Sequence, residues 1–575
     1  MKLSNIELSN RLNKLREFQF SFATGLLDGF EGAQYSLILI EAARVLDWET
    51  VLMGLSSDDS LQLKYPDYDV LSRGWNPLMA NILPRLPSLH GIPISESSSE
   101  SRGQIRSLLY AFGKIAILKK SADMAFHGLL EGEDMDGLLS LRMPLSEESD
   151  HFLDQLEDQK VATTLKLNER ADRESKSRLL SKEEIEEIVA DLIFPFETGH
   201  GTMVGYGADP RLDEHFFEIT VERSLEWRAE AGLHPNLVTP ALDGFPVGAV
   251  MMLLISAYMK HIWFVGIAKN KLENINYAMS LTIWKDPKEL VSLYSEFTGI
   301  AKSEIEKAFQ AIVVTKNDAE FFANEGAPFL PMLIEVSPGY WLAPVSSIFK
   351  NPFDSMRMLN EQRDPSIGDA LRAPRENWMI DDLESLFLGN RYIVITTPVR
   401  LKRGNHTITD IDAAILDITS GELALFQLKW QDFGSNVLSK IRSKAKNFVE
   451  QVGSWSEKTR SWIDEFGVRA LCKSLQIKLT ARQEIKTVLL FAIGKSNARF
   501  SSYGYTLKDD LISVCNWKQF VRLRYEVGPA ELVLSEIHRR CTLEKNAKLD
   551  IKPLVYDMNI GDVKLRFENM WSYSE

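Results

Sequence analysis

The segment at residues 408–430 constrains the fold of this chain more than any other. Two runs of β-branched and apolar residues are interrupted by Thr419, Ser420 and Gly421. This pattern predicts two antiparallel strands joined by a tight turn. A two-residue loop at Thr419 and Ser420 pairs Ile418 with Gly421 and so fixes the register of the whole hairpin.

The predicted register gathers polar side chains at one end of the hairpin. Side chains alternate between the two faces of a strand, so Asp410 and Asp412 share a face, as do Gln427 and Lys429. Asp412 is expected opposite Gln427, and Asp410 opposite Lys429, with Cβ atoms roughly 4.5–5.5 Å apart. Burying such groups is costly unless they pair or hold a metal. The alternative is a solvent-exposed edge hairpin, which the strongly apolar flanking residues disfavour.

The same residues resemble the active-site motif of the PD-(D/E)XK, or restriction-endonuclease-like, superfamily in its Gln-x-Lys variant. The family carries an aspartate at the end of one strand of a hairpin, which matches Asp412. It carries a Glu-x-Lys or Gln-x-Lys on the next strand, which matches Gln427 and Lys429. The resemblance also implies that the main-chain carbonyl of Leu428 is a metal ligand.

A helix expected before the hairpin supplies a further candidate acid. Residues 375–388 carry apolar side chains at helical spacing, which predicts an amphipathic helix. The first helix of the family brings one glutamate to the metal. Glu376, on the apolar stripe near the start of the helix, matches that position best. Glu384 is the rival and lies closer to the solvent side, and for either residue the alternative is an ordinary exposed helix acid.

The resemblance implies a metal-dependent endonuclease. Phosphodiester hydrolysis needs a hard cation held by oxygen ligands, here Mg²⁺ or Mn²⁺, which polarises the phosphoryl oxygen and helps to generate hydroxide. Lys429 would orient the attacking water or stabilise the developing negative charge. Gln427 replaces the commoner acid. This leaves open a second class of function, a catalytically inactive nuclease-fold protein that binds nucleic acid or acts as a scaffold.

The charge distribution predicts a nucleic-acid partner for the same part of the chain. The formal net charge is −14, yet residues 440–524 contain 17 basic and 7 acidic side chains, a local net charge of +10. A helix is expected at residues 439–452. Its basic side chains, which we expect to contact phosphates of DNA in preference to RNA, are Lys440, Arg442, Lys444 and Lys446. A solvated charged helix surface is the alternative.

A chain of 575 residues is too long for one core, so two to four domains are expected. The helix and strand patterns predict an α+β multidomain protein. We expect a large, mostly helical N-terminal region and a C-terminal α/β domain with the order helix, strand, strand, strand, helix, strand, helix. The expected boundaries are a helical domain at 1–160, a second at 161–345, a linker at 346–374, the nuclease-like domain at 375–540 and an extension at 541–575.

Other features limit the compartment and the partners. Three widely spaced cysteines argue against a disulfide framework and fit a reducing cytoplasm. The apolar run at residues 245–259 is shorter than the ~20 residues that span a membrane, so a buried core helix and no membrane partner are expected.

The N-terminal part of the chain offers weaker signals. The glycine-rich segment at residues 197–207 lacks the Gly-Lys-Ser/Thr of a phosphate loop and is expected to be a flexible loop. An enzymatic role for this loop is the third alternative. The helical region is a candidate surface for self-association or a partner protein. A nuclease behind a large unfamiliar module suggests, by analogy alone, a restriction or anti-phage defence effector.

Overall fold

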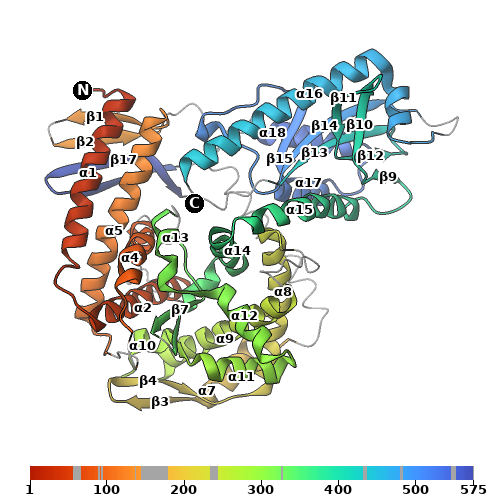
Figure 1. The fold of residues 1–575 in the computed structure, drawn as a ribbon. Helices are drawn as coiled ribbons and strands as arrows, with labels where there is room; N and C mark the ends of the chain where they lie inside the picture. Colours follow the sequence, from red (N-terminus) through yellow and green to blue (C-terminus); the bar gives the residue numbers. More distant parts are fainter. Residues whose placement is uncertain are drawn as a thin grey trace.

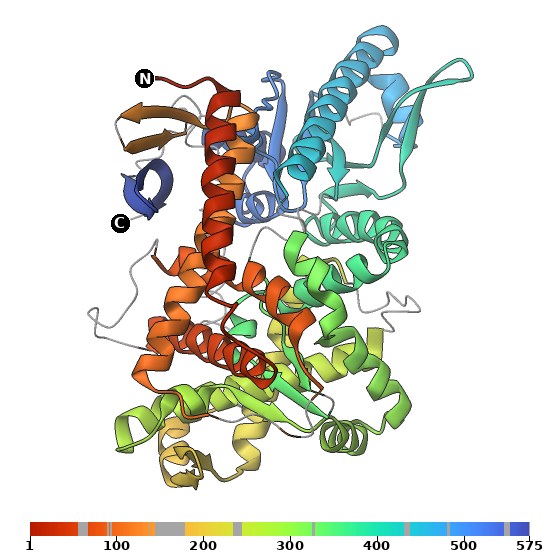
Figure 2. The same ribbon diagram turned by 60° about the vertical axis from the view of Figure 1, so that its left-hand side comes forward.

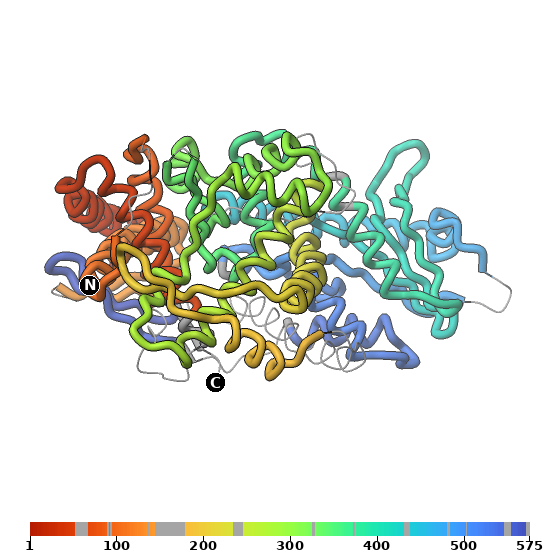
Figure 3. Tube along the Cα trace, turned by 90° about the horizontal axis from the view of Figure 1, so that it is seen from below, coloured from red at the N-terminus to blue at the C-terminus, as the bar shows by residue number. Residues whose placement is uncertain are grey.

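The computed structural model describes most of the chain as a mixed α and β protein, as predicted. The described residues are 1–55, 67–88, 91, 95–135, 137–143, 179–233, 244–324, 328–337, 339–430, 437–479, 484–545 and 552–573. An N-terminal column and a C-terminal α/β domain both adjoin a mostly helical middle body (Figures 1 and 3). The column and the α/β domain also contact each other, because Leu438 packs in one apolar cluster with Leu8 and Ile117.

The N-terminal column packs two long helices against a mixed sheet. Helices α1 (Asn5–Gly25) and α5 (Ser99–Phe126) run side by side in both views (Figures 1 and 2). The sheet has the order β1-β2-β17-β16, and β17 runs parallel to β2. Its strands are β1 (Glu131–Met135), β2 (Leu138–Arg142), β16 (Lys552–Ile560) and β17 (Val563–Tyr573). The segment at 541–575 is therefore no separate extension, because its alternating apolar side chains complete the core beneath α5.

The middle body is mostly helical around a small sheet of order β5-β8-β7-β6. Its helices are α2 (Ala33–Leu55), α3 (Asp67–Arg73), α4 (Trp75–Ile82), α7 (Lys182–Leu192), α8 (Pro210–Ala231), α9 (Gly244–Lys271), α10 (Tyr277–Leu281), α11 (Pro287–Thr298), α12 (Lys302–Ile312) and α13 (Ala319–Asn324). Its strands are β3 (Ile193–Thr198), β4 (Gly201–Tyr206), β5 (Ile283–Lys285), β6 (Val313–Val314), β7 (Leu333–Ser337) and β8 (Tyr340–Ala343).

Two predictions for the N-terminal region are wrong. The glycine-rich segment forms the antiparallel hairpin β3–β4 instead of a flexible loop, because residues on both sides of its turn pair along their full length. The boundary near residue 160 does not separate two cores. One apolar cluster contains Leu39 of α2, Leu109 of α5 and Ile334 of β7.

Helix α9 is the core helix expected from the apolar run, but it continues past Lys260 and His261 to Lys271. Among the described residues it is the one helix long and apolar enough to cross a membrane by length and composition. Half of its most apolar window is buried, and Val250, Leu254 and Tyr258 pack in the largest apolar cluster.

The segment at 346–374 is helical and not a linker. It contains α14 (Pro352–Arg363), which is capped by Asn351, and the first half of α15 (Ser366–Ser385). Pro352 occupies the first turn of α14, where its missing N–H costs nothing. Pro374 lies inside α15 without ending it, so the cluster of prolines gave a misleading signal for a boundary.

The C-terminal domain is an open sheet of order β15-β14-β13-β12-β9. Strands β12, β13 and β9 pair antiparallel, while β13, β14 and β15 are parallel. Helix α16 covers one face, and α15, α17 and α18 cover the other. The bounds are β9 (Tyr392–Ile395), β12 (Ala413–Asp417), β13 (Glu422–Lys429), α16 (Leu438–Ser474), β14 (Thr487–Gly494), β15 (Ile512–Asn516), α17 (Trp517–Val527) and α18 (Val533–Lys545).

The structure contains the predicted elements in the predicted order and adds the strand β15, the helix α18 and a hairpin. Strands β10 (Val399–Arg403) and β11 (His406–Ile411) follow β9 and precede β12 in the sequence, and they form a separate two-stranded sheet. Helix α16 is also longer than predicted, and its distal half supports the hairpin. The indole N–H of Trp462 donates to the carbonyl of Lys402 at 2.9 Å, and that of Trp455 donates to the carbonyl of Asp410 at 2.7 Å.

Candidate functional site

The hairpin β12–β13 has the predicted register. Ala413 pairs with Phe426 and Asp417 with Glu422, so Asp412 lies opposite Gln427. The two apolar faces alternate as expected. Ala414, Leu416, Leu423 and Leu425 pack on the α16 side, while the intervening residues pack on the α15 side. Strand alternation therefore directs Gln427 and Lys429 toward the α16 side.

The predicted pairing of Asp410 with Lys429 is wrong. The chain bends at Asp412, which belongs to no strand, and β11 leaves the sheet. Asp410 instead pairs with Arg400 of β10. The pairing of β12 with β13 stops at Phe426. Beyond Phe426, the edge of β13 that faces β12 therefore has no neighbouring strand.

The side chain of Asp412 lies where a neighbouring strand would otherwise pair with the end of β13. Its Oδ2 accepts a hydrogen bond from the backbone N–H of Leu428 at 2.7 Å and another from Nε2 of Gln427. Gln427 is 4% exposed, so this amide is committed to the site. Burial raises the pKa of Asp412 to about 6; the Leu428 N–H, Lys429 and Gln427 oppose this rise, and the neighbouring Asp410 adds to it.

The carbonyl of Leu428 lies on the same side of β13. The N–H and C=O of one strand residue point in the same lateral direction. Because the Leu428 N–H points at Asp412, its carbonyl also faces the Asp412 side. Leu428 pairs on its other side with Ile493 of the parallel strand β14. The arrangement thus brings a carboxylate and a main-chain carbonyl together, as the resemblance implied.

Lys429 is half-buried at the last position of β13. It pairs with Gly494 at the end of β14, and its carbonyl accepts from the N–H of Lys495 at 3.0 Å. Its positive charge lowers the pKa of Asp412 against the effect of burial. The site therefore lies at the carboxyl ends of parallel strands, where open α/β sheets bind ligands.

Helix α15 provides the predicted apolar stripe but starts earlier than expected. Met379, Ile380 and Leu383 are buried against the sheet. Glu376 lies in this helix, and the position of its side chain is outside the described residues. Its proximity to Asp412 stays a prediction. Glu384 is exposed, in agreement with its expected place on the solvent side.

The basic residues of α16 divide between two flanks of the helix. Lys440 and Lys444 are one turn apart, at a helical angle close to that of Trp455 and Trp462. These indoles face β10 and β11, so this flank faces the Asp412 side of the sheet. Lys440 is exposed and Lys444 is half-buried.

The other two basic side chains lie on the opposite flank of the helix. Arg442 donates to the carbonyl of Tyr503, and its guanidinium lies 5.1 Å from the ring centroid of Tyr505. Lys446 pairs with Glu450 at 3.7 Å. The four residues thus form no single stripe, and only Lys440 and Lys444 share the flank nearer the candidate site.

A lysine surrounded by aromatic rings adjoins the site and was missed in the sequence. The ammonium of Lys495 lies 4.9 to 5.7 Å from the ring centroids of Trp378, Trp430 and Trp517. Trp378 and Trp430 stack on each other. These tryptophans come from α15, from the residue that follows β13 and from the start of α17, so only the tertiary fold brings them together.

The same aromatic group contacts the middle body. Arg375 is 4% exposed and donates to the carbonyl of Gly232, which follows α8, at 3.4 Å. Lys518 of α17 pairs with Glu230 of α8 at 3.0 Å. Gly232 has φ of 70°, and a Cβ there would lie 2.5 Å from both Arg375 and Trp430. Glycine therefore permits the close approach of α8 to the domain that carries the site.

Within the described part of the chain, no group of three or more His, Cys, Asp or Glu side chains converges as a metal site. Comparisons with models of known protein families, with curated proteins and with solved structures found no match to this chain.

Proposed function

We propose that this protein is a metal-dependent nuclease that hydrolyses phosphodiester bonds, with DNA as the preferred substrate. The observation that carries the proposal is the meeting of the Asp412 carboxylate, the Leu428 backbone and Lys429 at the end of one hairpin. The order of helices and strands around this hairpin is the order expected of a PD-(D/E)XK core, which adds support.

The donors at this end of the hairpin suit a hard cation such as Mg²⁺ or Mn²⁺. Asp412 Oδ2 is engaged by two donors, which leaves Oδ1 for a cation beside the Leu428 carbonyl. Mg²⁺ needs only one or two carboxylates because it retains several waters, and Glu376 is the proposed second carboxylate. The cation would supply Lewis acidity toward the phosphoryl oxygen.

The protein residues would then have separate roles. Asp412 provides the charge that holds the cation, and Gln427 fixes the orientation of that carboxylate through its side-chain amide. Lys429 offers a positive charge where negative charge develops on the phosphate. Lys440 and Lys444 would contact the phosphate backbone on the same side, where each neutralised phosphate adds to affinity.

The energetic cost of the site also supports a functional role. A carboxylate whose pKa is raised by burial destabilises the folded state when it is ionised. Groups with such raised pKa values are enriched at catalytic sites.

The test is cleavage of plasmid DNA, single-stranded DNA and RNA in Mg²⁺, Mn²⁺ or EDTA. Asp412→Asn and Lys429→Ala should each reduce metal-dependent cleavage at least about 100-fold. The matched controls are Asp464→Asn and Lys473→Ala, which change exposed residues of α16 and should leave cleavage unaltered. If both site variants cut DNA at the wild-type rate, the proposal is wrong.

One observation favours a second function, a catalytically inactive protein that binds nucleic acid or acts as a scaffold. The side-chain amide of Gln427 donates to Asp412 and so occupies one oxygen of that carboxylate. The commoner motif has an acid at the position of Gln427. Binding of DNA without cleavage in any metal would support this function, especially if Gln427→Glu created activity. In both cases Lys440→Ala combined with Lys444→Ala should weaken DNA binding and reduce its salt dependence.

A further inference from the structure

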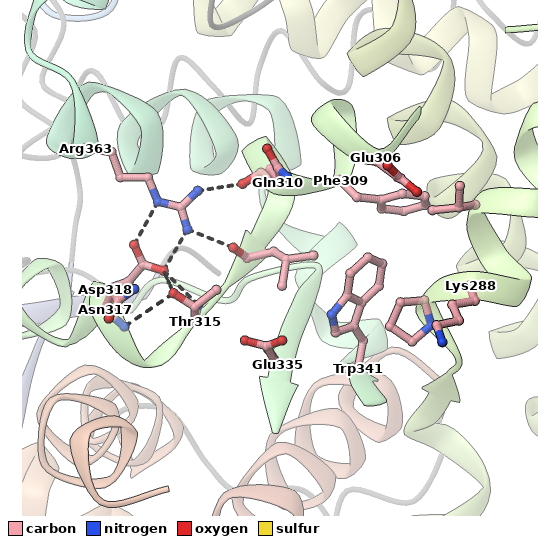
Figure 4. A pocket seen from close by; sticks show the side chains of 13 residues that line it. Lys288, Glu306, Phe309, Gln310, Thr315, Asn317, Asp318, Glu335, Trp341 and Arg363 are labelled. Atoms are coloured by element: carbon pink, nitrogen blue, oxygen red, sulfur yellow. Dashed lines mark hydrogen bonds and ion pairs between the residues drawn. The ribbon is translucent and has the colours of Figure 1, made fainter. Parts of the chain in front are cut away.

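A separate cavity lies in the middle body, remote in sequence from the candidate nuclease site. It has a volume of about 640 Å³, within the range of small-molecule sites. Its walls come from α11, α12, the strands β6, β7 and β8, and α14 (Figure 4). The question is which chemistry this cavity would accept.

Aromatic rings form one wall of the cavity. The rings of Phe309 and Trp341 lie 5.0 Å apart at an interplanar angle of 50°, and both line the space (Figure 4). Trp341 lies opposite Glu335 on the neighbouring strand. The cavity therefore offers an aromatic face beside a carboxylate, and aromatic faces attract cations through their negative electrostatic potential.

The arginine at the cavity is not available to an anion. Both Nε and Nη2 of Arg363 donate to the carboxylate of Asp318, at 2.8 and 2.7 Å, and the guanidinium also donates to the carbonyls of Gln310 and Val313 (Figure 4). These four hydrogen bonds engage the N–H groups of the guanidinium with partners inside the protein. Arg363 thus acts as a structural brace at one end of the cavity.

Glu335 has no such commitment. Its side chain is half-buried and lines the cavity, and within the described part of the chain it makes no hydrogen bond or ion pair. Burial raises the pKa of Glu335, and Lys316 opposes this only through its charge. A half-buried carboxylate of this kind gains from a ligand that donates hydrogen bonds.

The charges that line the cavity favour a cation over an anion. Lys288 and Arg363 contribute two positive charges, whereas Glu306, Asp318 and Glu335 contribute three negative charges. The net charge is −1, and the Arg363–Asp318 pair is internally neutral. A phosphate group would meet the Glu335 carboxylate, while an ammonium or guanidinium would meet both Glu335 and the aromatic wall.

We propose that this cavity binds a small organic cation, an alkylammonium or guanidinium compound, with Glu335 pairing with its N–H groups and Trp341 lying against its charge. The assignment is independent of the nuclease proposal, because it uses no residue of the C-terminal domain.

The experiment is isothermal titration calorimetry on the full chain with four probes. Agmatine and putrescine carry the proposed charge, 1,4-butanediol is a neutral counterpart of putrescine, and glutarate is an anion. We expect saturable binding of at least one cation below about 10 mM, with no binding of the diol or glutarate. Absence of cation binding, or equal binding of the diol, would overturn the proposal.

Variants connect the binding to the named residues. Glu335→Gln keeps the size of the side chain and should weaken cation binding at least about tenfold, since it removes a charge-assisted hydrogen bond. Trp341→Leu should weaken it to a similar extent. Glu304→Gln changes an exposed acid of α12 outside the cavity and is the matched control. The melting temperature of Glu335→Gln, at or above that of the wild type, would show that the variant is folded. Unchanged affinity for the cation in this folded variant would show that the cation binds elsewhere.

Discussion

Replacement of Asp412 by asparagine should stabilise the β12–β13 hairpin, although it should also abolish the proposed activity. The pKa of this carboxyl rises from the ordinary 3.8 to about 6, chiefly because burial disfavours its charge. Above pH 6 the difference corresponds to about 3 kcal/mol of destabilisation. Asparagine carries no charge, and its side-chain oxygen can still accept from the Leu428 N–H and from Gln427. The variant should therefore recover most of that free energy.

The pH dependence of this gain follows from the direction of the shift. A group whose pKa is raised in the folded state opposes folding more strongly as pH rises from about 4 to about 6, and equally at every higher pH. The advantage of Asp412→Asn should thus be about 3 kcal/mol at pH 8. It should fall to roughly half of that value at pH 5 and to well under 1 kcal/mol at pH 4.

Hydrogen exchange measured on peptides from β12 and β13 is the appropriate assay, because a chain with several cores need not unfold in one step. Protection of the amides near Leu428 should increase up to roughly 100-fold at pH 8 and about tenfold or more at pH 5. Lower protection in the variant at pH 8 would refute the reasoning, since it would mean that the ionised carboxylate stabilises the fold through its hydrogen bonds.

The matched control is Asp417→Asn, five positions along the same chain segment. Burial opposes the ionisation of Asp417, but Arg391, at 2.6 Å, and the backbone N–H of Thr419 more than compensate and lower the pKa of this carboxyl. Its charge is therefore stabilising at neutral pH, and the variant should lose about 1–3 kcal/mol. The two substitutions are expected to change protection in opposite directions.

Three further outcomes follow from the structure. The Mg²⁺ concentration needed for half-maximal cleavage should rise as pH falls below about 6, because Asp412 must lose its proton to hold a cation; a flat dependence from pH 5 to 8 would contradict this. Glu422→Ala should destabilise the start of α18 by about 1–2 kcal/mol, because the buried carboxylate accepts from two backbone N–H groups of its first turn; unchanged hydrogen exchange in α18 would argue otherwise. Gly232→Val should weaken the contact of α8 with Arg375 and Trp430 by about 2 kcal/mol, since its Cβ has no space and its φ is positive, which limited proteolysis of the full chain would detect as faster cleavage.

The register of the candidate site could be predicted because it depends on local sequence. The turn at Thr419 and Ser420 and the alternation of apolar residues fix which residue faces Gln427, and the structure has that pairing. Local sequence also specifies the start of α7, where Ser181 and Glu184 form a capping box, and the start of α17, which Asn516 caps.

The rest depends on contacts between distant segments. Residues 408–418 read as one continuous strand, and only the pairing of β11 with β10 shows that the chain bends at Asp412. Helix α16 continues beyond its predicted end to a kink at Gly467, which has non-helical dihedral angles. Trp455 and Trp462 anchor this added part of the helix to the hairpin. The rings around Lys495 come from three separate elements, so no sequence window contains the group.

The parallel pairing of β17 with β2 has a consequence for biosynthesis. The ribosome makes residues 138–142 early and residues 563–573 more than four hundred positions later. The sheet beneath α5 therefore stays open until the α/β domain has already emerged and begun to fold. Until then the exposed edge of β2 is a site where a nascent chain can mispair, so chaperone dependence during translation should be concentrated in the N-terminal column.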